Sequence, residues 1–218
     1  MCLAPTDASS TVLTCHGMLS SLETLANIQI VKKMKILGTV ITDKLNWDEN
    51  CHELILKVNR RMLLLKTMHN FGATKEEMVH LWIIYCRSHL EQSAVVWSSS
   101  LTEENKTNLE RTQKCFVKLI FPKRYKTEND QSYKDLLQEL NLQTLEKRRE
   151  ILCLKFAKDC IKFNKLKDII PENEDMTKTR HKEKFKVLHA NLDRLKDSSI
   201  IYMQNLLNTE YKQNKQMK

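Results

Sequence analysis

Residues 46–72 read NWDENCHELILKVNRRMLLLKTMHNFG, and their apolar positions recur at helical spacing. The apolar positions that share one face, at intervals of three or four residues, are Ile55, Val58, Met62, Leu65 and Met68. Gly72 follows, and glycine adopts the left-handed conformation that ends many helices. The pattern therefore predicts one long helix from about Asn46 to Asn70.

Capping signals predict further helices downstream. Thr74-Lys-Glu-Glu77 is a capping box, in which the Thr74 hydroxyl and the Glu77 carboxylate each accept from a backbone N–H of the first turn. The helix that it opens is expected to run to about Trp97. Thr102 and Thr144 stand at the starts of two more apolar patterns. The remaining predicted helices span about 102–122, 132–140, 144–163 and 200–207.

The segment before residue 46 has the character of strands. Ile28-Gln-Ile-Val31 and Met34-Lys-Ile-Leu-Gly-Thr-Val-Ile41 are rich in β-branched residues, with Lys32-Lys33 between them. We predict a small β-hairpin with the lysine pair at its turn. Gly38 would interrupt the second strand, as a bulge or as a place where another backbone approaches closely.

Composition supports a mainly α fold. The 218 residues include only three Gly and three Pro, too few for the many tight turns of an all-β domain, and 41% are hydrophobic. We expect a helical bundle preceded by a small β-hairpin and followed by a looser helical tail. The expected division is an irregular leader at 1–26, the hairpin at 27–45, the bundle at 46–165, and a basic linker and tail at 166–218.

Charge and cysteine content indicate the compartment and the partner. The formal net charge is +9, which favours nucleic acid or an anionic surface as a partner. No apolar run approaches the ~20 residues that a membrane span needs. Seven Cys without a CxxC pair suggest reduced thiols, and the N-terminus lacks the layout of a secretory signal. We therefore expect an intracellular protein, nuclear or cytoplasmic, without a membrane partner.

Other residue groups favour structural interpretations over chemistry. The paired carboxylates 48–49, 76–77 and 103–104 lie in first turns, where negative charge offsets the helix dipole. Trp82 lies on an apolar stripe and is expected in the core. Cys153, Cys160, His181 and His189 match no common zinc spacing, and Cys160 fits a helix core. We expect no metal and no cofactor.

Several stretches, in order, resemble reverse transcriptases of jockey-like non-LTR retrotransposons, in the region that follows the polymerase palm. They are KILGTVITDKLNW at 35–47, RSHLEQSAVVWSSSLT at 87–102, LERTQKCFVK at 109–118, LEKRREILCLKFA at 145–157, and the tail stretches RHKEKF at 180–185, SSIIY at 198–202 and LLN at 206–208. Each piece is weakly specific, whereas their order and spacing together are specific. The resemblance covers about residues 34–208.

The resemblance implies a role for each part. Residues 35–38 would correspond to the primer grip, which supports the primer's 3′ end, although Ile36 replaces the aromatic residue usual there. The helices that follow would be the thumb, which lies along the template–primer duplex. Gln92 and Ser93 stand where many relatives carry Tyr-Gly. The residues expected to contact the duplex are Lys35, Gly38, Arg60, Arg61, Lys114, Lys118, Lys147, Arg148 and Arg149.

The sequence contains no adjacent aspartates of the kind that bind the catalytic metals in these polymerases. We therefore expect no polymerase activity from this chain alone, with the palm either encoded separately or missing. The expected function is salt-sensitive, sequence-tolerant binding of nucleic acid. Two alternatives stay open: a captured helical module that docks on another protein through an exposed stripe, and an inert relic of a truncated element.

Overall fold

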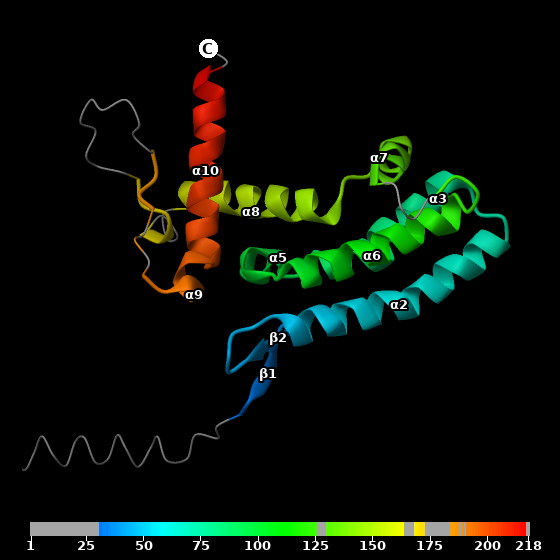
Figure 1. Cartoon of the computed structure of the whole chain (residues 1–218), viewed down its shortest axis with the longest axis horizontal. Helices are drawn as coiled ribbons and strands as arrows, with labels where there is room; N and C mark the ends of the chain where they lie inside the picture. Colours follow the sequence, from blue (N-terminus) through cyan, green and yellow to red (C-terminus); the bar gives the residue numbers. More distant parts are fainter. Residues whose placement is uncertain are drawn as a thin grey trace, which may run out of the picture.

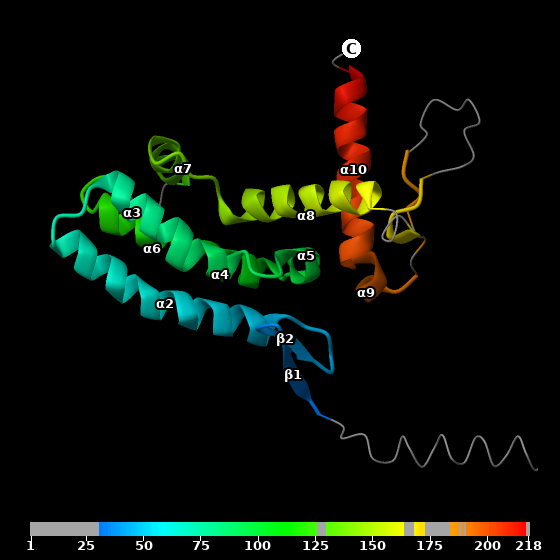
Figure 2. The same cartoon turned by 180° about the vertical axis from the view of Figure 1, so that it is seen from behind.

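The computed structural model describes residues 31–125, 130–163, 168–172, 184–187, 189 and 191–216. The chain is mainly helical, with one two-stranded antiparallel sheet before the helices, as predicted. Figure 1 shows helix α2 along one edge, α3 to α6 in the next layer, and α8 beyond them, with α10 crossing α8. The view from behind shows the same order (Figure 2).

The hairpin lies further along the chain than predicted. Strand β1 (Lys33–Ile36) pairs antiparallel with β2 (Thr39–Thr42), and the turn is Leu37-Gly38. Both turn residues have positive φ, 49° and 86°, as a two-residue type I′ turn requires. The prediction that Gly38 interrupts a strand was wrong, because Gly38 is needed for the turn itself. The Lys32-Lys33 pair is not a turn, and residues 28–30 lie outside the described residues.

Helix α2 (Asp48–Asn70) confirms the first predicted helix and its end. It buries Leu54, Val58 and Leu65 against the rest of the bundle, and Gly72 follows with φ +85°. Polar contacts join it to the hairpin: the Asn50 Oδ1 accepts a 3.1 Å hydrogen bond from the Val40 N–H, and the Glu49 and Glu53 carboxylates pair with Lys33 and Lys35.

The helix that starts after Thr74 is not continuous to Trp97 as predicted. Helix α3 (Lys75–Leu81) opens with the predicted capping box and leads into a π-helix, η1 (Trp82–Arg87), and a short α4 (Ser88–Leu90). The chain then breaks, because Ser93 takes a left-handed conformation with φ 53°. It resumes as α5 (Ala94–Trp97) and a 3₁₀ turn, η2 (Ser98–Ser100).

Three predicted helices of the bundle are confirmed. Helix α6 (Glu103–Ile120) is capped by the Thr102 hydroxyl, which accepts from the Asn105 N–H at 3.2 Å. Helix α7 (Asp130–Glu139) follows. Helix α8 (Leu145–Lys162) is capped by the Thr144 hydroxyl, which accepts from the Lys147 N–H at 3.2 Å.

The C-terminal region contains a short α9 (Asp193–Lys196) and α10 (Ser199–Gln216), which is longer than the predicted 200–207. The Asn208 amide holds Phe185 on α10 through two 3.0 Å hydrogen bonds to its backbone N–H and carbonyl. The predicted leader at 1–26 lies outside the described residues, as do residues 166–167, 173–183, 188, 190 and 217–218 of the predicted linker and tail.

Two apolar clusters form the core. The larger joins α2 to α8 and includes Trp82 and Phe116, whose rings stack with their centroids 4.7 Å apart. The smaller joins α8 to α10 through Cys153, Ile170 and Met203. Trp82 and Cys160 are fully buried, which confirms the core interpretation for both. Among the described residues, no helix is long and apolar enough to span a membrane.

Candidate nucleic-acid interface

A groove of about 610 Å³ runs along α6, where α7 and the start of α8 meet it. Five basic and three acidic side chains are among the residues that line it. The basic ones are Lys106, Arg111, Lys114, Lys118 and Lys134, and the acidic ones are Glu103, Glu110 and Glu146. Tyr125 and Tyr133 add aromatic surface. The arrangement offers cations and rings in one concavity.

Helical spacing places the groove cations together. Lys106, Lys114 and Lys118 are separated by multiples of four residues, so they share one face of α6, and Arg111 lies beside Lys114. The rise of 1.5 Å per residue spreads Lys106 and Lys118 over about 18 Å along the axis. Lys134 reaches the same groove from α7.

Most of these cations are available to a ligand. The side chains of Arg111, Lys118 and Lys134 form no hydrogen bond or ion pair with any described residue. Lys106 pairs with Glu103 at 2.7 Å, and the Lys114 Nζ lies 5.2 Å from the centre of the Tyr133 ring. Among the described residues, no carboxylate would have to be displaced from Arg111, Lys118 or Lys134, so these three cations are suited to phosphate groups.

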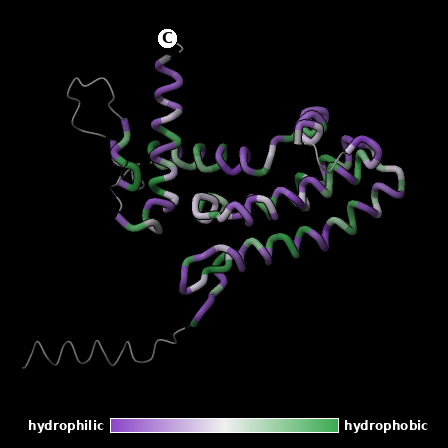
Figure 3. The backbone as a smooth tube through the Cα atoms, viewed as in Figure 1, coloured by the Kyte–Doolittle hydropathy of each residue, from purple (hydrophilic) through white to green (hydrophobic). Residues whose placement is uncertain are grey.

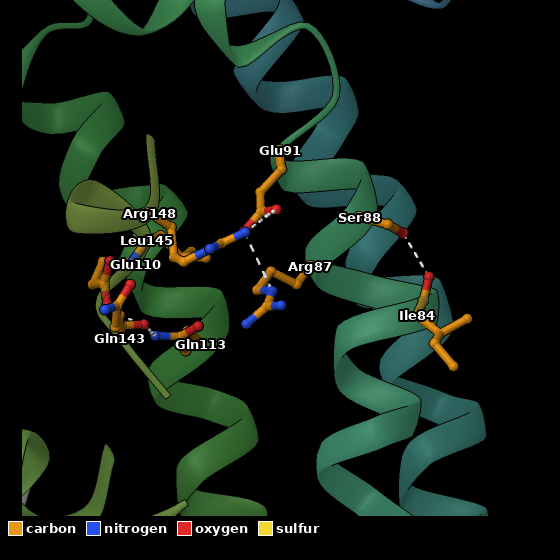
Figure 4. A network of polar contacts seen from close by, with 9 residues as sticks. All are labelled: Ile84, Arg87, Ser88, Glu91, Glu110, Gln113, Gln143, Leu145 and Arg148. Carbon is orange, nitrogen blue, oxygen red and sulfur yellow. Dashed lines mark hydrogen bonds and ion pairs between the residues drawn. The ribbon is translucent and has the colours of Figure 1, made fainter. Parts of the chain in front are cut away.

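The floor of the groove is a polar junction of three helices. The Glu110 carboxylate accepts from the Tyr133 hydroxyl at 2.5 Å and from the Leu145 N–H at 2.9 Å. The Gln113 Nε2 donates to the Gln143 carbonyl at 2.9 Å (Figure 4). Burial raises the pKa of the Glu110 carboxyl, and the hydrogen bond from Tyr133 opposes that shift. The junction fixes α7 and the start of α8 against α6.

Two of the predicted contact residues, Lys114 and Lys118, lie in this groove. Three others already have carboxylate partners. Lys35 pairs with Glu53, Lys147 pairs with Glu150 at 2.9 Å, and Arg148 forms a bidentate pair with Glu91. A phosphate would have to compete with each carboxylate, so these three positions are weaker candidates than the groove.

Arg148 and Arg149 differ in their surroundings although they are adjacent. The Arg148 Nε and Nη2 donate to the Glu91 carboxylate at 2.9 and 3.1 Å, and Arg87 approaches the same carboxylate at 3.3 Å (Figure 4). Hydrogen bonding to Glu91 raises the pKa of Arg148. Arg149 is only 4% exposed, and burial lowers the pKa of its guanidinium. Both guanidinium groups are therefore part of the protein's own packing.

Gly38 and the α2 arginines lie away from the groove. A Cβ on Gly38 would meet the Gln92 Nε2 at 2.5 Å, so the close approach to Gly38 is made by a side chain of this chain. The Arg61 Nη1 donates to the Tyr85 carbonyl at 3.0 Å. Arg60 is exposed and forms no side-chain hydrogen bond or ion pair with a described residue.

The sequence interpretation missed Lys106, Arg111 and Lys134 as members of the groove. The spacing of four residues between Lys106, Glu110, Lys114 and Lys118 is visible in the sequence and indicates a shared helix face. Lys134 carries no such signal, because only the packing of α7 brings it to α6. Among the described residues, no three His, Cys, Asp or Glu are grouped as metal ligands, and His181 lies outside those residues.

Comparison of the chain with protein-family models, curated proteins and solved structures finds no match in any of the three.

Proposed function

We propose that this chain binds nucleic acid without sequence preference through the groove on α6 and α7. On this proposal it is the thumb-like remnant of a non-LTR retrotransposon reverse transcriptase, and the catalytic palm would come from elsewhere or be missing. The observation that carries the proposal is a set of three groove cations, Arg111, Lys118 and Lys134, whose side chains pair with no carboxylate among the described residues.

Two further observations support the proposal. The chain as a whole has an excess of nine positive charges, which attracts polyanions at long range. The segment 109–118, which resembles the corresponding part of the retrotransposon enzymes, contributes Arg111, Lys114 and Lys118 to the groove. Contacts of this kind hold phosphates and carry no base information, so affinity is expected to depend on salt and not on sequence.

The test is fluorescence anisotropy with a labelled RNA–DNA duplex and with a second duplex of unrelated sequence. The variant combines Arg111→Gln, Lys118→Gln and Lys134→Gln. The control combines Lys44→Gln, Lys155→Gln and Lys215→Gln, which removes the same charge at exposed positions outside the groove. Each titration is repeated between about 50 and 200 mM salt.

The groove variant is expected to bind both duplexes about tenfold or more weakly than the unchanged chain. The slope of its log binding constant against log salt concentration is expected to be smaller in magnitude by about three, one for each lost phosphate contact. The control variant should lose less affinity, because it lowers only the net charge and leaves the groove unchanged. Equal losses in the two variants would show that the groove is not the site. Strong preference for one duplex, or no binding at the lowest salt, would contradict the function itself.

A further inference from the structure

The outer side of α2 exposes large apolar side chains. Leu63 is 67% exposed, and Leu56 and Leu64 are also exposed. At 100° per residue, these three lie within one sector, opposite the side that buries Val58 and Leu65. Figure 1 shows α2 at the edge of the bundle, with the other labelled helices all on its inner side, and Figure 3 shows hydrophobic residues interspersed with hydrophilic ones along it.

This apolar stripe continues into a groove at the end of α2. The groove has a volume of about 460 Å³ and lies between the end of α2 and the helices α3 and η1. Its apolar lining includes Met68, Phe71, Leu81 and Ile84, of which Phe71 is 83% exposed. The Ser88 hydroxyl donates to the Ile84 carbonyl at 2.5 Å (Figure 4), so one wall of the groove belongs to a hydrogen-bonded helix.

The outer face of α2 is basic, and the groove at its end is lined by one acidic residue, Glu77, whose carboxylate accepts from the Thr74 N–H and hydroxyl. Between Glu53 and Glu76 the chain carries five Lys and Arg and no Asp or Glu. Arg60 and Lys66 are exposed, and their side chains form no hydrogen bond or ion pair with a described residue. Apolar side chains and unpaired cations therefore alternate along one surface. A complementary surface would be apolar along one stripe and acidic beside it.

We propose that the outer face of α2, with the groove at its end, docks an acidic amphipathic helix of a partner protein. The partner's apolar stripe would pack on Leu56, Leu63 and Phe71, and its carboxylates would face Arg60 and Lys66. From Leu56 to Phe71 the face is about 22 Å long at 1.5 Å per residue, which matches a partner helix of about four turns. This surface is separate from the α6–α7 groove.

Charge and shape favour this occupant over three others. A second copy docked through the same face would bring Arg60 and Lys66 near the cations of its partner. Nucleic acid would satisfy the cations and leave Leu63 and Phe71 against a polyanion. An anionic lipid surface would satisfy both kinds of residue, but it has no side chain to fill the groove beside Ile84.

The experiment uses the full chain and a fluorescein-labelled synthetic peptide of about 16 residues. The peptide carries Leu at intervals of three and four, and Glu and Ala elsewhere. A second peptide has the same composition in an order that leaves no apolar face. Binding is followed by fluorescence anisotropy for three proteins: the unchanged chain, Leu63→Ser with Phe71→Ser, and Arg60→Gln with Lys66→Gln.

Matched controls are Phe163→Ser, an exposed aromatic residue on another helix end, and Lys44→Gln with Lys155→Gln. The amphipathic peptide is expected to bind about tenfold more tightly than the reordered one. Each α2 variant is expected to weaken that binding about tenfold, and the controls to leave it within about twofold.

Equal binding of the two peptides, or equal losses in the α2 variants and the controls, would overturn the proposal. Two further measurements separate the other occupants. If the chain binds no peptide but binds phosphatidylserine vesicles, and both α2 variants lose that vesicle binding, the face is assigned to lipid. A concentration-dependent dimer in analytical ultracentrifugation that Leu63→Ser with Phe71→Ser abolishes, again without peptide binding, would assign it to a second copy.

Discussion

The Gln92 Nε2 donates a 2.8 Å hydrogen bond to the carbonyl of Leu37, and this contact joins the hairpin turn to the break after α4. Gly38 lies directly beneath the amide, so the hairpin can approach only because residue 38 has no side chain. Gln92 is held in turn by its own carbonyl, which accepts from the Trp97 Nε1 at 2.9 Å. The position of the hairpin on the bundle therefore depends on this contact.

Gly38→Ala is expected to lower the free energy of unfolding by about 2–3 kcal/mol. Roughly 1–2 kcal/mol comes from the positive φ, and the rest comes from the clash with Gln92. Urea unfolding followed by circular dichroism measures the loss.

Gly72→Ala is the matched control, because Gly72 has nearly the same φ, +85°, and nothing within 4 Å of the added Cβ. Its free energy of unfolding should fall only by the part that comes from the positive φ. If both variants lose the same amount, the Gln92 contact does not constrain residue 38.

Leu37→Asn is expected to stabilise the protein by about 0.5–1 kcal/mol. Leu37 is 90% exposed with φ 49°, and Asn-Gly is a favoured pair for a type I′ turn. Thermal unfolding should show a higher Tm. Leu37→Val is the comparison, since a β-branched residue adopts positive φ less readily than Leu and should lower the Tm. A Tm for the Asn variant at or below that of the unchanged protein would contradict the turn assignment.

Ser93→Gly is expected to raise the free energy of unfolding by about 1 kcal/mol. A serine in the left-handed conformation, here with φ 53°, is strained, whereas a glycine adopts that conformation without strain. Denaturant unfolding of Ser93→Gly and Ser93→Ala separates backbone from side-chain effects. If Ser93→Ala stabilises the protein to the same extent, the serine side chain destabilises it, and the backbone conformation does not.

Arg148→Gln and Lys147→Gln test whether these adjacent cations stabilise the fold. Arg148 forms a part-buried bidentate pair with Glu91, whereas Lys147 is exposed and pairs with Glu150 within one helix turn. Loss of Arg148 is expected to cost about 1–2 kcal/mol, and loss of Lys147 less than about 0.5 kcal/mol. Chemical denaturation gives both values. A larger loss for Lys147 would show that the Glu91 network does not hold α8 to α4.

Glu110 is expected to make stability fall as pH rises above about 4.5, the ordinary pKa of a glutamate. Burial raises the folded-state pKa, so over the range between the two pKa values the folded state binds more protons than the unfolded state. Its contribution is therefore lost as pH rises through that range.

The measurement compares the unchanged protein with Glu110→Gln by urea unfolding at several pH values. The difference in unfolding free energy by which the unchanged protein exceeds Glu110→Gln should decrease as pH rises from about 4.5, because only the unchanged protein titrates at residue 110. Gln also leaves the Tyr133 hydroxyl or the Leu145 N–H without an acceptor, which should cost about 1–3 kcal/mol. A difference that is constant with pH would show that Glu110 does not titrate with a raised pKa.

Local signals in the sequence determined most of the helices. The apolar spacing in 46–70, the capping box at Thr74, and Thr102 and Thr144 each predicted a helix start or face that the structure has, because such signals act within one or two turns. The sequence also placed Lys114 and Lys118 among the contact residues, and both line the groove.

Tertiary structure alone decided the rest. Arg148 and Arg149 look equivalent in sequence, but the bundle pairs one with Glu91 and buries the other. The break at Ser93, the turn at Leu37-Gly38 and the place of Lys134 in the groove depend on contacts between residues far apart in the chain. Helix faces and caps follow from neighbours along the sequence, whereas the side chains that meet across helices depend on how those helices pack.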